Sequence, residues 1–102
     1  MAYVLIRRVT RPSNVAWYSA ANTTVTTSTV SSLATFVAAQ PGLQHNAQHT
    51  RDGGLQSDAM YVFDTKANGV AFKAALLADA SYQTIEAYNN ANGITTIWHQ
   101  IQ

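Results

Sequence analysis

Cysteine is absent from this 102-residue sequence, and charged side chains are scarce. Without cysteine the chain can form no disulfide, no thiolate nucleophile and no metal site with sulfur ligands. Charged residues make up 11% of the chain, against roughly 25% in an average soluble domain. The net charge of +1 provides no long-range field that would collect nucleic acid or anionic lipid. A partner rich in phosphate is therefore not expected.

Long apolar runs are also missing, and none approaches the roughly 20 residues that a membrane-spanning helix needs. Met1 to Arg8 is a short apolar run that ends in two arginines, whereas a secretory signal has its basic residues first. We therefore expect a soluble, cytoplasmic or otherwise intracellular protein without a signal peptide. A chain of this length can bury one modest core, so residues 1–102 are expected to form a single domain.

Four segments have the character of β-strands. Tyr3 to Thr10 and Leu55 to Asp64 carry bulky apolar residues on both faces, which is typical of strands in the interior of a sheet. Leu43 to Arg51 alternates only weakly, as an edge strand does, and Ile94 to Ile101 alternates as a closing strand. Asp52-Gly53-Gly54 predicts a hairpin turn, because glycine accepts the positive φ of tight reversals.

Two segments have helical periodicity. The first begins at a cap, Thr27 or Ser28, and runs to Gln40, where Pro41-Gly42 ends it; its apolar stripe is Val30, Leu33, Ala34 and Val37. The second begins after Thr65 and runs to Asp79, and a further helical piece extends from Ser81 to about Asn92. The expected packing stripe of the helix after Thr65 is Val70, Ala71, Ala74, Leu77 and Ala78. In the further piece Tyr82, Ile85 and Tyr88 are spaced by three.

The resulting order is strand, helix, strand, strand, helix, strand. Two right-handed crossovers with a hairpin between them give the split βαβ arrangement, an α+β fold of ferredoxin-like topology. This fold has a four-stranded antiparallel sheet with its helices on one face, and its first and third strands lie in the middle. Those are the two strands that are apolar on both faces, so sequence and topology agree.

Helices on one face leave the other face of the sheet uncovered, although the central strands are apolar there too. Burial of apolar area is worth roughly 25 cal/mol per Å², and a second copy of the chain is a partner that is always present. We therefore expect a homodimer that packs through the open sheet face. The alternative is that the long connection from Arg11 to Thr27, which carries Trp17, folds over that face.

The topology, the length, the helix stop at Pro41-Gly42-Leu43 and the passage from strand to helix over Phe63 to Ala78 resemble the dimeric α/β-barrel superfamily, which includes antibiotic-biosynthesis monooxygenases. The resemblance implies two sheets that face each other in a dimer, with ligand pockets between sheet and helices. In haem-degrading members an Asn, a Trp and a helical His form the site. Here the first strand has arginines and no Asn, the second helix has no His, and Trp98 lies on a strand, so we expect no cofactor.

The histidines do not predict a metal site. His45 and His49 share a strand face but are separated by roughly 13 Å, and His99 lies on the opposite edge strand. They remain candidate ligand-binding residues that a partner subunit would have to bring together. Arg7 and Arg8 point to opposite faces, and with Arg11 they either hold an anion or pair locally with Asp58 or Asp64. An inward-facing arginine should have a carboxylate or carbonyl partner.

Aromatic side chains complete the candidate set. Trp17 and Tyr18 in the long connection either line a pocket or anchor the loop. Tyr61 and Tyr3 have the same parity as Phe63 and Leu5. They either pack in the core or project a phenol into a cavity on the sheet face as a proton donor, with Trp98 as a further candidate near Tyr61.

Three functions remain open, and the sequence does not decide whether the protein is an enzyme. The first is a small ligand-binding or structural module. The second is a cofactor-independent monooxygenase or isomerase acting on a small apolar substrate in a pocket near Tyr61, Trp98 and the Trp17 loop. A cavity of roughly 300 Å³ or more with a His or Tyr inside would favour this second function, and a filled core would favour the first. The third is single-stranded nucleic-acid binding through Met60-Tyr61-Val62-Phe63 on the open face, which the low net charge disfavours.

Overall fold

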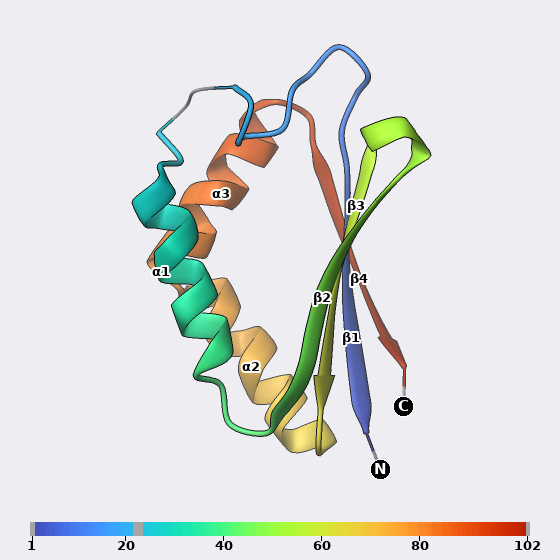
Figure 1. Ribbon diagram of the computed structural model, residues 1–102, viewed down its shortest axis with the longest axis vertical. Coiled ribbons are helices and arrows are strands. Elements are labelled where there is room, and N and C mark those ends of the chain that lie inside the picture. The colour runs from blue at the N-terminus through green and yellow to red at the C-terminus, as the bar shows by residue number, and fades with distance from the viewer. Residues whose placement is uncertain (1, 22–23, 102) are drawn as a thin grey trace.

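A layer of helices covers one face of a four-stranded antiparallel sheet (Figure 1). The computed structural model describes residues 2–21 and 24–101. The elements are β1 (Tyr3–Thr10), α1 (Thr27–Ala38), β2 (Leu43–Arg51), β3 (Gln56–Phe63), α2 (Lys66–Ala78), α3 (Ala80–Ala91) and β4 (Thr95–Ile101). The predicted ferredoxin-like order is confirmed, with α2 and α3 in place of one broken helix. None of the helices described is long and apolar enough to cross a membrane.

The sheet has the order β2-β3-β1-β4, so the two strands that are apolar on both faces occupy its centre, as predicted. Antiparallel pairing sets Tyr3 opposite Phe63 and Leu5 opposite Tyr61. All four of these side chains are buried against the helices. Since successive residues of a strand alternate between faces, the odd-numbered residues of β1 and β3 face the helices and the even-numbered residues face away.

One half of the helix-covered face is tightly filled. Phe72 of α2 lies 4.8 Å from the ring of Tyr61 and 5.0 Å from the ring of Phe63, measured between ring centroids. Leu76, one helical turn further on, and Tyr3 of β1 are also fully buried. These large side chains pack α2 against the central strands, so this half supplies much of the core that holds the two layers together.

The expected packing stripe of α2 is wrong. Val70 and Leu77 are 51% and 47% exposed, and the buried residues of α2 are Gly69, Phe72 and Leu76. The cause is the size of two aromatic rings: burial of Phe72 sets the rotation of the helix, and the Tyr3 ring fills the space where Gly69 has no side chain. Periodicity alone did not distinguish this stripe from its neighbour.

The caps of the helices fix where each one begins. Thr26, one residue before the predicted cap, accepts a hydrogen bond from the Thr29 amide at 3.2 Å, and Thr65 caps α2 as predicted. Asp79 interrupts the second helical segment, and its carboxylate accepts a hydrogen bond from the Tyr82 amide at 3.0 Å. The interruption at Asp79 starts α3 as a new helix over the other half of the sheet.

The described part of the connection between β1 and α1, without residues 22–23, does not cover the open face of the sheet, so the alternative that Trp17 folds over that face is wrong. Trp17 Nε1 donates to the carbonyl of Gly54 at 2.8 Å, and the Tyr88 hydroxyl of α3 donates to the carbonyl of Ala16 at 2.6 Å. Both bonds hold the described part of the connection at the end of the helix layer (Figure 1). The open face therefore stays bare in the single chain, with Ile97 54% and Ile101 56% exposed.

Replacement of Gly69 by alanine tests the packing of α2. Intrinsic propensity favours Ala over Gly in a helix by about 1 kcal/mol, but a Cβ at Gly69 would overlap the Tyr3 ring. We expect Gly69→Ala to lower the free energy of unfolding by about 1–3 kcal/mol, measured by chemical denaturation. Ala75→Gly, at an exposed position of the same helix, reports propensity alone. A Gly69→Ala variant more stable than the natural chain would contradict this packing.

Candidate functional site

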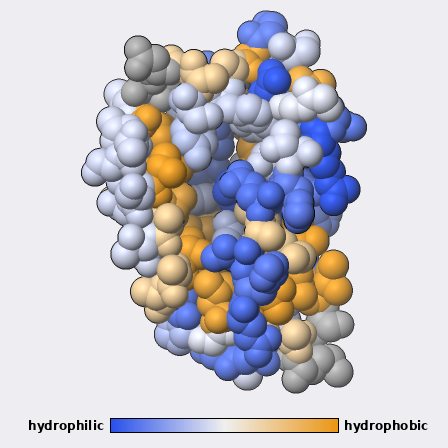
Figure 2. Space-filling model, in the orientation of Figure 1, coloured by the Kyte–Doolittle hydropathy of each residue, from blue (hydrophilic) through white to orange (hydrophobic). Residues whose placement is uncertain are grey.

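The second half of the space between helices and sheet is hollow. A cavity of about 570 Å³ lies between α1, α3 and the sheet, and it is visible in Figure 2 between hydrophobic side chains of α1 and polar side chains of β2. The sheet residues beneath it, Ser57 and Ala59 on β3 and Thr50 on β2, are small. The cavity therefore arises where the strands change from large aromatic residues to small ones.

The wall of the cavity on the α1 side is apolar. It is made by the stripe predicted from the sequence, Val30, Leu33, Ala34 and Val37. Only Val37 is fully buried, and Val30 is 40% exposed. Val37 joins the core and Leu33 packs against it, while the rest of the stripe leaves apolar surface at the cavity that is available to a ligand.

Arg7 brings a positive charge into this cavity. It lies on the helix-facing side of β1, opposite the small Ala59, and its Cζ atom is 5.6 Å from the centroid of the Tyr82 ring. Among the described residues no carboxylate lies within 4 Å of it, and its buried Nε has no hydrogen-bond partner. The expectation that an inward arginine has a carboxylate or carbonyl partner is not met at this atom.

The charge of Arg7 is permanent. Burial acts to lower the pKa of Arg7, but interactions with Tyr61, Tyr82 and Glu86 outweigh burial and raise the pKa above its usual value. Because arginine is already protonated at all ordinary pH values, the cavity contains a cation under every condition in which the fold persists.

The neighbouring arginines are engaged elsewhere, as local pairing predicted. Arg8 points to the open face and binds both carboxylate oxygens of Asp58, at 3.1 and 3.2 Å, and Arg51 approaches the same carboxylate at 3.3 Å. The hydrogen bond from Arg8 holds the pKa of Asp58 below its usual value, against the opposing effect of burial. Arg11 donates to the carbonyls of Gly54 and Val15.

Two tyrosines complete the polar side of the cavity. Tyr61 of β3 packs between Phe72 and Trp98, whose ring centroid is 6.4 Å away, and lines the cavity. Tyr82 of α3 is buried, and its hydroxyl has no hydrogen-bond partner. Burial, reinforced by the Glu86 carboxylate, raises the pKa of Tyr82 to about 12. The Tyr82 hydroxyl therefore keeps its proton at neutral pH and is available as a donor.

Asn89 is a further polar residue of the cavity, and the sequence reasoning missed both it and Tyr82. Asn89 is buried; its amide nitrogen donates to Glu86 at 3.4 Å, while its Oδ1 has no partner. Residues 82, 85 and 89 follow the spacing of one helix face. An asparagine at the third position of an apolar stripe was the signal that would have identified it.

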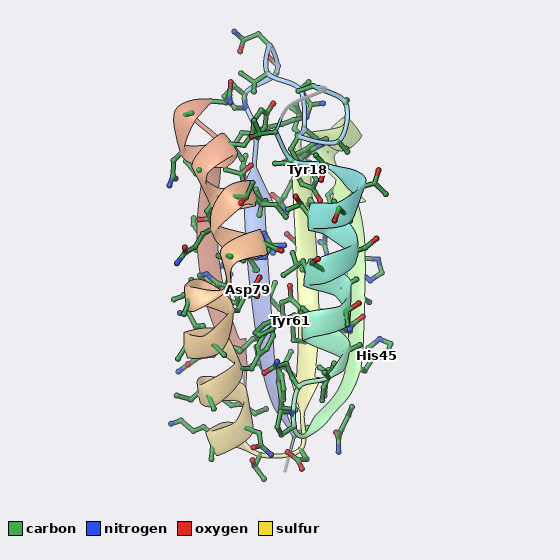
Figure 3. All side chains as sticks on the ribbon, turned by 90° about the vertical axis from the view of Figure 1, so that its left-hand side faces the viewer. Tyr18, His45, Tyr61 and Asp79 are labelled. Carbon is green, nitrogen blue, oxygen red and sulfur yellow. The ribbon has the colours of Figure 1, made fainter. Side chains whose placement is uncertain are left out.

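Four of the predicted site residues do meet at this cavity: Arg7, Tyr61, Trp17 and Tyr18. In Figure 3, Tyr61 lies between α1 and the paired helices α2 and α3, and Tyr18 lies near one end of α1. Trp98 packs against Tyr61, and Lys73 Nζ lies 5.0 Å from the centroid of the Trp98 ring. Trp98 is not among the residues that line the cavity. Trp17 also anchors its loop, through its bond to Gly54.

The three histidines lie away from the cavity. The strand register places His45 opposite Val62, His49 opposite Asp58 and His99 opposite Ile6, all on the open face. Figure 3 shows His45 at the outer edge of β2. Within residues 2–21 and 24–101, no three His, Asp or Glu side chains are grouped to bind a metal. No histidine lines the described cavity either.

The aromatic residues of β3 are not available for base stacking. Tyr61 and Phe63 are buried against the helices, whereas Met60 and Val62 face outward. The proposed stacking surface for single-stranded nucleic acid is therefore wrong, because stacking needs exposed rings.

Arg7→Met tests whether Arg7 serves the cavity or the fold. Since interactions with Tyr61, Tyr82 and Glu86 outweigh the cost of burying Arg7, while its Nε has no hydrogen-bond partner, we expect Arg7→Met to lower the free energy of unfolding by no more than about 1 kcal/mol. The matched variant Arg8→Met removes the main partner of Asp58 and should lower the unfolding midpoint. Thermal and chemical denaturation measure both. A marked loss of stability in Arg7→Met would show that Arg7 holds the fold together.

No protein-family model matches the chain, and no curated protein matches it in sequence. Solved structures do match its backbone. SnoaB, a cofactor-independent oxygenase from Streptomyces nogalater, superposes in a mutant form with a TM-score of 0.65 and 16% identity over 99% of this chain and 91% of that one. Rv0793 from Mycobacterium tuberculosis gives 0.66 and 10% over 100% and 94% of the two chains.

An antibiotic-biosynthesis monooxygenase-like protein from Chloroflexus aurantiacus gives a TM-score of 0.55 and 14% identity, over 99% of this chain and 91% of that one. At sequence identities this low, the comparison shows only that the backbone folds are similar. The chain has a ferredoxin-like α+β fold, which it shares with these solved structures.

Proposed function

We propose that this protein binds a small, largely apolar molecule in the cavity between α1, α3 and the sheet. The observation that carries the proposal is the cavity itself: about 570 Å³ lies within the roughly 300–1,000 Å³ typical of small-molecule sites. Its apolar wall on α1 and its few polar groups on β1 and α3 have the usual composition of such sites. A purely structural module would have a filled core here.

The position of the cavity also supports binding. One half of the molecule is packed by Tyr3, Phe63, Phe72 and Leu76, so the hollow half is not needed to hold the layers together. A domain of this size gains from filling its interior, because each unfilled space forfeits packing energy. Retention of a hollow with an exposed apolar wall is therefore best accounted for by a ligand that fills it.

Binding of a neutral dye tests this proposal. The naphthalene dye prodan should bind the natural chain with increased, blue-shifted emission, because its rings leave water for an apolar wall. Ala34→Trp places a large ring in the cavity and should weaken binding at least tenfold. The control Ala75→Trp adds the same ring at an exposed site on α2 outside the cavity and should bind as the natural chain does. Equal binding by both variants would place the dye elsewhere.

The partner that the open face favours is a second copy of the chain. Val4 and Ile6 of β1, Met60 and Val62 of β3, and the exposed Ile97 and Ile101 of β4 share that face. The connection that carries Trp17 is held elsewhere by the carbonyl of Gly54. A face of this composition is poorly suited to water, and sheet-to-sheet packing of two copies would bury it.

Lysine substitution on the open face tests the dimer. The natural chain should have twice its 11.0 kDa mass in light scattering after size exclusion. Ile97→Lys should shift the protein to the monomer, because a dimer would have to bury the new charge. Val70→Lys alters a similarly exposed apolar residue on the helix side and should remain dimeric. A natural chain that is monomeric at micromolar concentration would contradict the dimer.

A second candidate function is cofactor-independent oxygenation, which the fold shared with SnoaB favours. In such a reaction an acidic CH₂ group of the substrate loses a proton and its electrons reduce O₂. One oxygen atom becomes the new carbonyl and the other leaves as water. Phenols such as Tyr61 and Tyr82 would supply protons to the reduced oxygen. We expect oxygen uptake, measured with an electrode, when an anthrone or a similar acidic CH₂ compound is added, and a loss of uptake in Ala34→Trp.

A further inference from the structure

Three buried polar atoms of the cavity have no hydrogen-bond partner: Nε of Arg7, the hydroxyl of Tyr82 and Oδ1 of Asn89. All three residues line the same cavity. Buried polar atoms without partners are rare, since each one loses its bonds to water on folding. Three of them around one hollow indicate the hydrogen bonds that a bound molecule would complete.

The chemical types of these three atoms determine which ligand groups would form hydrogen bonds with them. Arg7 can only donate hydrogen bonds and carries a fixed positive charge, and Tyr82 keeps its proton because its pKa is raised to about 12. The pair, with the Arg7 Cζ 5.6 Å from the Tyr82 ring centroid, therefore suits an oxygen that accepts bonds and is negatively charged. Oδ1 of Asn89 is an acceptor, which needs a hydroxyl or N–H group.

The neighbours of Asn89 fix its orientation. Its amide nitrogen donates to Oε1 of Glu86, and the same carboxylate oxygen accepts from the Thr96 hydroxyl at 3.1 Å. A reversed amide would set Oδ1 against the Glu86 carboxylate, with two acceptors facing each other. Oδ1 is therefore the amide atom of Asn89 that is left without a hydrogen-bond partner.

The two polar ends of the site are separated along α3. Tyr82 and Asn89 are seven residues apart, which is two turns or about 10 Å of helix. A ligand that bonds to both must reach past Glu86, whose carboxylate interacts with Tyr82, Asn89 and Arg7. The apolar wall of α1 lies across from α3, so the body of the ligand between its two ends should be apolar.

We propose that the ligand is an elongated aromatic acid with a carboxylate or similar oxyanion at one end and a hydroxyl at the other. The oxyanion binds Arg7 and Tyr82, and the hydroxyl donates to Asn89. This assignment rests on the proposed binding function and names the chemical class of its ligand.

Calorimetric titration with four naphthalenes tests the assignment: 6-hydroxy-2-naphthoate, its methyl ester, 2-naphthoate and naphthalene. The hydroxy acid should bind best, the ester at least tenfold more weakly because it lacks the charge, and 2-naphthoate about three- to tenfold more weakly because it lacks the donor. An ester that binds as tightly as the acid would overturn the oxyanion site. Failure of all four, naphthalene included, would instead overturn the binding function itself.

Variants assign each end of the ligand to its residues. Arg7→Met and Tyr82→Phe should reduce the preference for acid over ester to less than threefold while leaving the preference for the hydroxyl intact. Asn89→Leu should abolish the hydroxyl preference alone. Tyr3→Phe is the control, since the Tyr3 hydroxyl is already bonded to Gln100 at 2.7 Å, and it should leave both preferences unchanged. If Arg7→Met retains the full acid preference, the assignment is wrong.

Discussion

The register between β1 and β3 is the constraint on which the rest of the structure depends. Because Tyr3 pairs with Phe63 and Arg7 pairs with Ala59, the bulky rings of both strands gather at one end of the helix-facing side and the small residues at the other. The first end becomes a packed core and the second a hollow. A shift of one residue would turn every one of these side chains to the opposite face, so core and cavity are fixed together.

The two faces of the sheet have separate roles. The helix-covered face contains the core and the cavity, with Arg7 directed inward, whereas the open face carries the Arg8 and Asp58 pair among apolar side chains. Because side chains alternate along β1, the adjacent Arg7 and Arg8 lie on opposite faces of the sheet and make different interactions. Arg8 binds the carboxylate of Asp58. Arg7 lines the cavity, and its buried Nε has no hydrogen-bond partner.

Sequence patterns predicted the strands, their order and the opposite faces of Arg7 and Arg8, because alternation in strands is strict. The buried face of α2 was predicted wrongly because two neighbouring stripes are apolar there, and only the Tyr3 ring against Gly69 decides between them. Tyr82 and Asn89 were missed because their role depends on what lies across the cavity. Helical spacing shows that a residue is buried, but it does not show that the space in front of it is empty.

Gly54 links Trp17, which lines the cavity, to the β2–β3 hairpin. Its carbonyl oxygen accepts hydrogen bonds from both Trp17 Nε1 and Arg11 Nε, and the Arg11 guanidinium lies over the Trp17 ring at 5.5 Å. A molecule that displaced the indole on entry would break one of these bonds and loosen the other contacts of the turn. Entry of such a molecule would therefore change the contacts of the β2–β3 turn, although Gly54 itself does not line the cavity.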